Sequence, residues 1–209
     1  MNSDATVFVV DDDRAARESV VALVTLKGLT AKGFSSADEF LSQYDPTQKG
    51  CLVVDVRMAG PSGLDLLRQL NVRKSSLPVV VVTSHADVAM AVRAMQAGAT
   101  TFLEKPCQEE ELWLAIEHAL EIEQTQFARR KERVEIEGRL ATLTEDEREV
   151  FRRLLQGHAN KRIAADLDIG LRTVELRRSN IMKKMQAASL PDLVRMAILI
   201  ELLRAEGTP

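Results

Sequence analysis

The stretch CLVVDVRMAGPSGLDLL, residues 51–67, runs from a block of apolar residues through a short polar loop into a helical pattern. Residues 51–56 are apolar apart from Asp55, as is typical of a strand buried on both faces of a sheet. Residues 62–70 have the apolar spacing of a helix. A buried strand followed by a helix is the repeating unit of α/β folds, and the stretch therefore favours that class.

The same alternation extends over the first half of the chain. Apolar runs predict strands at residues 6–10, 30–34, 78–83 and 100–103, and helical patterns follow at 14–27, 36–44, 87–97 and from 109 onward. With the quoted stretch, five strands alternate with five helices. That order predicts a parallel sheet with helices on both faces.

The second half of the chain has only helical patterns, at residues 145–156, 160–166, 173–185 and 190–205. Gly170 lies in the short turn between the second and the third of them. Two helices joined by a short glycine-containing turn are typical of a helix-turn-helix.

The charges differ between the two halves. Residues 1–123 contain 11 Lys+Arg and 18 Asp+Glu, whereas residues 124–209 contain 17 and 13. An acidic half joined to a basic half indicates two functions, the basic one facing nucleic acid. The length of 209 residues suits two domains. We expect an α/β domain at 1–120, a helical linker at 121–141 and an all-helical domain at 142–209.

The composition favours a cytoplasmic protein without a membrane segment. No apolar run approaches the roughly 20 residues that cross a bilayer, and the N-terminus lacks the basic flank and apolar stretch of a secretory signal. Cys51 and Cys107 are not in a CxxC pair, so we expect ordinary thiols in a reducing compartment.

The predicted linker has a partial heptad pattern. Apolar residues recur every seven positions, at Trp113, Leu120, Phe127, Val134 and Ala141. The complementary seam turns polar after its first member, which gives half of a coiled coil. Two interpretations stay open: a helix that contacts a partner along one stripe, and a solvated charged linker.

Polar side chains follow the ends of four predicted strands: Asp11 and Asp12, then Asp55, Thr83 and Lys105. The carboxyl ends of parallel strands meet at one edge of a sheet, so we expect these side chains to gather there. Clustered carboxylates need a neutralising cation, and hard oxygen ligands favour Mg²⁺. A carboxylate beside a metal, an ammonium and a hydroxyl is equipped to accept a phosphoryl group.

Residues 6–120 resemble the receiver domain of two-component response regulators. The matching motifs are VVDDD (9–13), VVDVRMAGPSGLDLL (53–67), VVVTSHAD (80–87) and AMQAGATTFLEKP (94–106). The resemblance implies a flavodoxin-like, doubly wound, five-stranded parallel sheet in the order 2-1-3-4-5. It also implies a role for each matching residue: Asp55 as phosphoacceptor, Asp11, Asp12, Asp55 and the backbone carbonyl of Arg57 as Mg²⁺ ligands, Thr83 and Lys105 as phosphate contacts, and Phe102 as the switch aromatic.

The chain departs from the receiver pattern near the pocket. Ala59 stands where the family usually has proline, which predicts a more mobile loop after Asp55. Asp13 is a third acid beside the two expected metal ligands. Phe102 replaces the commoner tyrosine and keeps its bulk. Pro106 matches a position that commonly follows a cis peptide bond.

The second domain resembles the LuxR/FixJ-type helix-turn-helix, from LT at 143–144 through NKRIA at 160–164 to RTVE at 172–175. The resemblance implies a four-helix unit whose last helix, 190–202, pairs with its twin on DNA. The apolar stripe of Val174, Ile181 and Met185 should face the core. The expected DNA contacts are Glu175, Leu176 and Ser179 at bases, and Asn160, Lys161, Arg172, Thr173, Arg177, Lys183 and Lys184 at or near the backbone. Arg177 stands where many relatives have histidine.

The residues together predict a transcription regulator whose DNA binding and dimerisation are controlled by phosphate on Asp55. The expected partners are a sensor histidine kinase, double-stranded DNA and a second copy of the chain, with RNA polymerase as a candidate. An aspartyl phosphatase is disfavoured, because such enzymes need an acid two residues after the nucleophile and this chain has Arg57 there. A DNA-binding adaptor with a vestigial pocket is disfavoured by the complete set of pocket residues. We therefore expect no enzyme.

Overall fold

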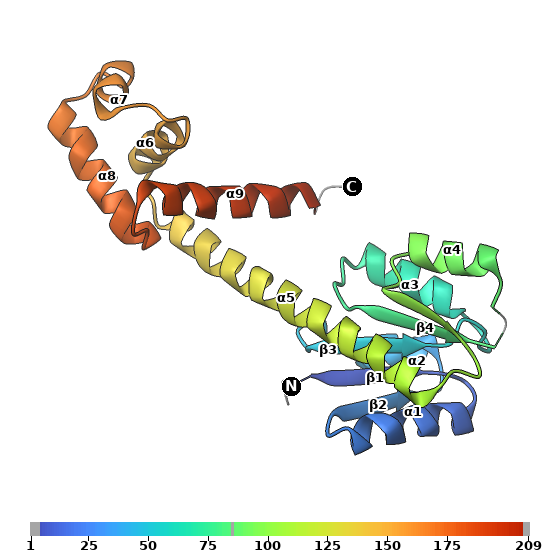
Figure 1. The fold of residues 1–209 in the computed structure, drawn as a ribbon. Coiled ribbons are helices and arrows are strands. Elements are labelled where there is room, and N and C mark those ends of the chain that lie inside the picture. The colour runs from blue at the N-terminus through green and yellow to red at the C-terminus, as the bar shows by residue number, and fades with distance from the viewer. Residues whose placement is uncertain (1–4, 85, 207–209) are drawn as a thin grey trace. The chain divides into compact units, whose positions relative to one another are not determined.

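The computed structural model describes residues 5–84 and 86–206, the last six of them by their backbone alone. The chain divides into two compact units, residues 1–128 and 129–209. The first unit contains a five-stranded parallel sheet in the order β2-β1-β3-β4-β5 (Figure 1). Its strands are β1 Thr6–Val10, β2 Thr30–Phe34, β3 Gly50–Val54, β4 Val79–Thr83 and β5 Thr101–Glu104. The predicted fold and strand order are confirmed.

Helices cover both faces of the sheet. Successive strand residues point to opposite sides, so apolar strands present an apolar surface on each face. On one face Phe8 and Val10 of β1 pack in a core with α2 Ala37–Gln43, α3 Gly63–Val72 and α4 Val88–Gln96. On the other face Val7 and Val9 pack with α1 Arg14–Leu26 and the start of α5 Glu109–Ala141. A sheet covered in this way explains why its inner strands β1, β3 and β4 are apolar along nearly their whole length.

The second unit is a small helical domain around its own core. It comprises the end of α5 and α6 Glu145–Leu155, α7 Asn160–Asp166, α8 Leu171–Met185 and α9 Leu190–Glu206. Val174, Ile181 and Met185 of α8 are fully buried, as the apolar stripe predicts. The helix begins two residues earlier than expected, because the carbonyl of Gly170 accepts the amides of Thr173 and Val174 and so starts it at Leu171.

Helix α5 runs without interruption from Glu109 to Ala141. Trp113 is buried in the core of the first unit, and Lys49 lies 4.2 Å from the ring centroid of Phe127. Val134 is 67% exposed. The early members of the heptad stripe thus pack within the first unit, whereas Val134 is open to solvent.

Within the described residues, no helix combines the length and the apolar character needed to cross a membrane.

Candidate functional site

Three of the predicted pocket residues form one bonded cluster at the carboxyl edge of the sheet. Asp11 follows β1 and Asp55 follows β3, and these residues are only 4% and 8% exposed. The ammonium of Lys105 lies 2.6 Å from Oδ2 of Asp11 and 2.9 Å from Oδ2 of Asp55. A single cation therefore balances two nearly buried carboxylates that are 44 residues apart in sequence.

Lys105 is held in place by its backbone as well as by its charge. Its amide donates to the carbonyl of Thr83 at 2.8 Å, and the bond to Pro106 is cis, as the resemblance implied. Burial lowers the pKa of the Lys105 ammonium, but the hydrogen bonds and charges of Asp11 and Asp55 outweigh burial, and the pKa is raised overall. Lys105 is therefore charged at physiological pH and available to an anion at this edge.

Thr83 comes from β4, which lies beside β3, and Phe102 comes from β5, the next strand along the sheet. Thr83 is the last residue of β4, is fully buried and pairs in register with Glu104. Phe102 of β5 pairs with Val81 and packs, half-buried, against the core formed with α2, α3 and α4. The two side chains thus lie along neighbouring strands that lead to the cluster.

Asp12 is placed differently from the other acids. It is exposed, and its Oδ2 accepts the amide of Ala59 at 2.9 Å. A proline at position 59 has no amide hydrogen and could not make this bond. Ala59, which stands in place of the family's proline and predicted a more mobile loop, therefore gives the loop a hydrogen bond to Asp12, a predicted metal ligand.

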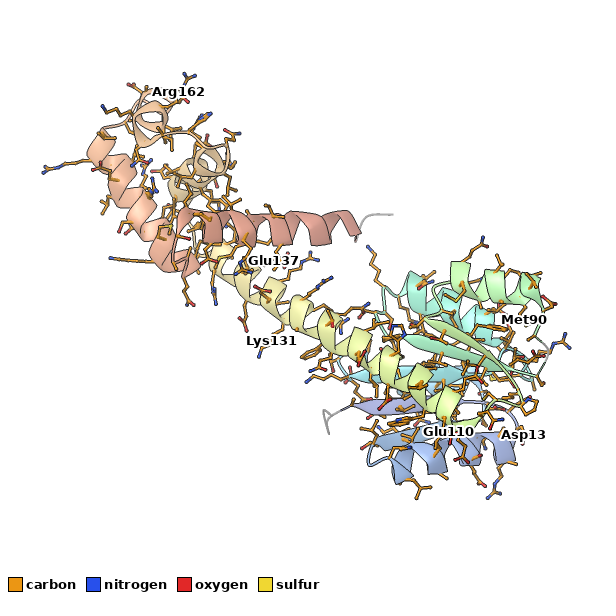
Figure 2. The ribbon with its side chains drawn as sticks, viewed as in Figure 1. Asp13, Met90, Glu110, Lys131, Glu137 and Arg162 are labelled. Atoms are coloured by element: carbon orange, nitrogen blue, oxygen red, sulfur yellow. The ribbon has the colours of Figure 1, made fainter. Side chains whose placement is uncertain are left out.

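Two further residues flank the cluster. The amide of Arg57 donates to Oδ1 of Asp55 at 3.1 Å, and the Arg57 residue itself is exposed. Asp13 is the N-cap of α1, where its Oδ1 accepts the amides of Ala15 and Ala16 (Figure 2). The third acid is thus engaged in helix capping and does not join the Lys105 cluster.

The start of α3 lies directly against the backbone of Asp55. A Cβ atom on Gly63 would lie 2.2 Å from the Asp55 carbonyl oxygen, so only glycine fits there. Ser62 and Asp65 form a reciprocal capping box that fixes the first turn of the helix. The first turn of α3 thereby packs against the backbone of Asp55, the candidate phosphoacceptor, and limits its movement.

The pocket has the donors of a magnesium site without a preformed cage. Among the described residues, no three His, Cys, Asp or Glu side chains converge closely enough to hold a metal ion. Asp11 and Asp55 are turned to Lys105, and Asp12 is turned to Ala59. The donor set of three carboxylates and a carbonyl nevertheless fits Mg²⁺, which prefers hard oxygen ligands.

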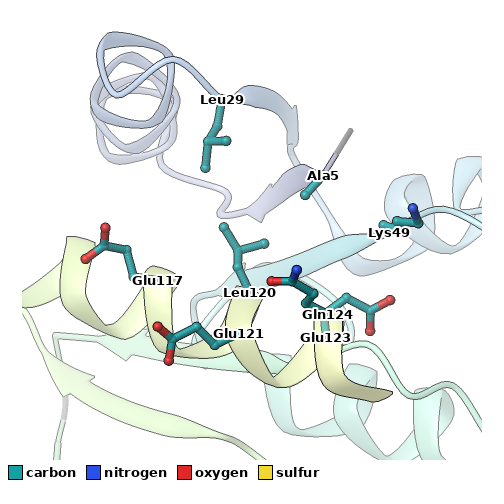
Figure 3. Close-up of a pocket in the computed structure, with 8 residues that line it drawn as sticks. All are labelled: Ala5, Leu29, Lys49, Glu117, Leu120, Glu121, Glu123 and Gln124. Carbon is teal, nitrogen blue, oxygen red and sulfur yellow. The ribbon is translucent and has the colours of Figure 1, made fainter. Parts of the chain in front are cut away.

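A separate cavity of about 280 Å³ lies at the opposite edge of the sheet (Figure 3). Ala5, Leu29 and Lys49, which precede β1, β2 and β3, line it together with residues of α5. Because it opens at the amino ends of the strands, it is not part of the acidic cluster.

The predicted DNA-contacting residues lie mainly on the outside of the second unit. The exposed ones are Lys161, Arg172, Glu175, Leu176, Ser179 and Lys183, with Leu176 62% exposed. Thr173, Arg177 and Asn160 are half-buried. The charged and polar outer side of α7 and α8, which also carries Arg162 (Figure 2), can meet a phosphate backbone.

Four polar contacts in this unit were not predicted from the sequence. Arg178 donates to Oδ1 of Asn160 at 3.0 Å, and Arg177 forms an ion pair with Asp146. Lys184 pairs with Glu147 at 2.6 Å and also donates to the carbonyl of Thr142. Only Glu147 had a local signal, the Thr144-x-x-Glu147 capping box. The other partners come together through the packing of separate helices.

The Glu147–Lys184 pair predicts a pH dependence. The hydrogen bond from Lys184 lowers the pKa of Glu147, while burial opposes the shift. The stability that the carboxylate contributes is complete above the pKa of an unfolded glutamate and is lost as the pH falls through the lowered folded value. Urea unfolding followed by circular dichroism should show this acid loss. Glu147→Gln should reduce it, while the other carboxylates whose pKa is lowered, among them Asp65 and Asp192, keep their share. Glu145→Gln, at an exposed carboxylate, should leave it in place.

The comparisons with known proteins cover both units. The model "Response regulator receiver domain" matches residues 7–117, and "Bacterial regulatory proteins, luxR family" matches residues 141–197. The transcriptional regulatory protein FixJ of Azorhizobium caulinodans is 45% identical over 210 residues, with 100% of each chain covered. The response regulator protein TodT of Pseudomonas putida is 40% identical, with 91% of this chain and 84% of TodT covered.

A solved structure gives the same result. The structure of the response regulator StyR matches with a TM-score of 0.83 and 40% identity, covering 93% of this chain and 98% of StyR. Phosphorylation control is the general function of receiver domains, and LuxR-type domains bind DNA. The chain therefore belongs to the two-component response regulators, as a phosphorylation-controlled transcription regulator with a receiver domain and a LuxR-type DNA-binding domain.

Proposed function

We propose that Asp55 is the residue that accepts the phosphoryl group from a sensor histidine kinase. The observation that carries the proposal is the position of the Asp55 carboxylate, nearly buried and 2.9 Å from the Lys105 ammonium. In the transfer, an Asp55 oxygen forms the bond to phosphorus and the kinase histidine leaves. Lys105 then balances charge on the phosphoryl oxygens, and the Thr83 hydroxyl donates to one of them.

Asp11, Asp12, Asp55 and the carbonyl of Arg57 are the proposed Mg²⁺ ligands. Bound there, the metal supplies charge neutralisation for the transferring oxygens. The hard oxygen donors support this assignment. Since Lys105 contacts both Asp11 and Asp55, it keeps the two carboxylates at the edge of the sheet without metal.

The hydrogen bond between Ala59 and Asp12 predicts an effect on metal affinity. Ala59→Pro removes the amide hydrogen that now binds the Asp12 carboxylate. The Ala59 amide then no longer competes with the metal for the Asp12 carboxylate. A competing hydrogen bond of modest strength corresponds to Mg²⁺ binding that is roughly fivefold tighter in the variant. Calorimetric titration with Mg²⁺ measures this. Ala59→Gly keeps the amide hydrogen and should leave the affinity near that of the wild type. Weaker binding by the proline variant would contradict the competition.

We propose that phosphate on Asp55 acts through β4, which lies beside β3, and through β5, the next strand along the sheet. Thr83 ends β4 and Phe102 pairs with Val81 of the same strand, so an inward movement of Thr83 is coupled to Phe102. The change biases the receiver domain toward a form in which the chain dimerises and its second domain binds DNA. The proposed partners are thus the kinase, DNA, a second copy and RNA polymerase, and the place of action is the cytoplasm.

The proposed DNA-binding surface is the outer side of α7 and α8. Base contacts are assigned to Glu175, Leu176 and Ser179. All three are exposed, and they lie at the start or in the middle of α8. The backbone contacts are assigned to Asn160, Lys161, Arg172, Thr173, Arg177 and Lys183. We propose three parts of the chain: a receiver domain at 1–120, a helical linker at 121–141 and a DNA-binding domain at 142–209.

Sedimentation of the full chain tests the switching proposal. Beryllofluoride with Mg²⁺ mimics phosphate on an aspartate, so the wild type should shift from monomer to dimer when both are added. Asp55→Ala should sediment alike with and without them. An unchanged mass for the wild type would contradict phosphate-induced dimerisation. A shift in mass for Asp55→Ala would contradict the role of Asp55 in it.

A further inference from the structure

The guanidinium of Arg177 is already engaged within the second unit. It lies on α8, and its Nη2 pairs with Oδ2 of Asp146 in the first turn of α6. The Arg177 side chain is 23% exposed, whereas the Asp146 side chain is 68% exposed. The pair is thus open to solvent on the carboxylate side, and an incoming anion can compete with Asp146 for the guanidinium.

The two exposed basic residues of α8 are not held in this way. Arg172 and Lys183 are exposed, and within the described part of the chain neither forms an ion pair. Arg177 directly follows Leu176, which is proposed to contact a base. Lys184 has a buried counterion in Glu147, whereas Arg177 has a counterion, Asp146, that is itself mainly exposed and can be displaced from the solvent side.

We propose that Asp146 competes with DNA phosphates for Arg177 and thereby weakens sequence-independent binding to DNA. The inference rests on the proposed DNA-binding surface. Binding to random DNA depends mainly on neutralising phosphates with lysine and arginine. As long as Arg177 stays on Asp146, one such contact is missing.

The test compares two variants that lose the same charge in the same helical turn. Asp146→Asn removes the partner of Arg177. Glu145→Gln removes the neighbouring acid, whose Oε1 lies 3.0 Å from Arg152. Both are made in the full chain, with and without Arg177→Gln, and circular dichroism verifies folding. Fluorescence anisotropy measures binding to a random-sequence duplex over a series of salt concentrations, with Mg²⁺ and beryllofluoride present.

Asp146→Asn should bind random DNA roughly 2- to 5-fold more tightly than Glu145→Gln, as expected for the loss of an exposed ion pair. Its plot of log affinity against log salt should be steeper by about 0.9, since one more phosphate is neutralised. Adding Arg177→Gln should erase both differences.

Two other results would overturn the inference for different reasons. Equal affinities and slopes for Asp146→Asn and Glu145→Gln, in a protein that binds the duplex, would show that Asp146 is an ordinary surface acid. Failure of the wild type to bind any duplex at low salt would instead refute the proposed DNA-binding surface, and the competition with it.

Discussion

Asp55→Ala should abolish phosphorylation of the protein by acetyl phosphate. The substitution removes the only nucleophilic oxygens that the proposal provides for the phosphoryl group. The fold should survive, because Lys105 keeps its 2.6 Å contact with Asp11 and the Asp55 amide keeps its bond to the carbonyl of Val10. Intact-protein mass after incubation with acetyl phosphate and Mg²⁺ measures the result: the wild type gains one phosphoryl group and the variant none.

Asp13→Ala is the matched control for this experiment. Asp13 is a neighbouring acid, but it caps α1 and lies outside the Lys105 cluster. Its loss should cost about 1 kcal/mol of stability and leave phosphorylation intact. Asp11 is the structural rival for the acceptor role, because it also contacts Lys105. Full phosphorylation of Asp55→Ala, located by peptide mapping to Asp11, would transfer the assignment to Asp11.

Gly63→Ala should destabilise the receiver domain by about 3 kcal/mol. The new methyl group would lie 2.2 Å from the carbonyl oxygen of Asp55, and a backbone atom cannot turn away as a flexible side chain can. Either α3 or the Asp55 loop must shift. Phosphorylation by acetyl phosphate should also slow, since the acceptor moves relative to Lys105.

Urea unfolding followed by fluorescence of Trp113 measures this effect. Trp113 is the single tryptophan of the chain and is buried in the first unit, so its signal reports on the receiver domain. Gly138→Ala is the control: it is the same substitution inside α5, where a Cβ meets nothing within 4 Å. Because Gly138 lies in the second unit, circular dichroism, which reports on both units, follows the two variants beside the fluorescence. That variant should be unchanged or slightly more stable. An unaltered unfolding midpoint for Gly63→Ala would show that α3 can move away from Asp55 at little cost.

The sheet was predictable because its inner strands β1, β3 and β4 are buried on both faces. A run such as residues 51–56 carries no polar alternation, and the acids that follow such runs meet at one edge once the strands are parallel. The strand ends were less well predicted. β3 ends at Val54, two residues before the apolar run does, because Val56 lies beyond the ladder while remaining part of the core.

The contacts of the site could not be read from local patterns. The bond between Ala59 and Asp12 joins residues 47 apart, and the pair of Arg177 with Asp146 joins residues 31 apart. Their formation depends on how loops and helices pack, which local periodicity does not encode. In both cases the sequence marked the position as unusual for its family, but the partner became visible only in the structure.

Phosphate on Asp55 should control binding to DNA. The affinity of the full chain for a duplex, at one fixed salt concentration and with and without beryllofluoride and Mg²⁺, measures this control. The wild type should bind at least about fivefold more tightly when both are present, the lower end of typical allosteric coupling. The affinity of Asp55→Ala should not change. Equal affinity of the wild type in the two conditions, or an equal gain in Asp55→Ala, would contradict the claim.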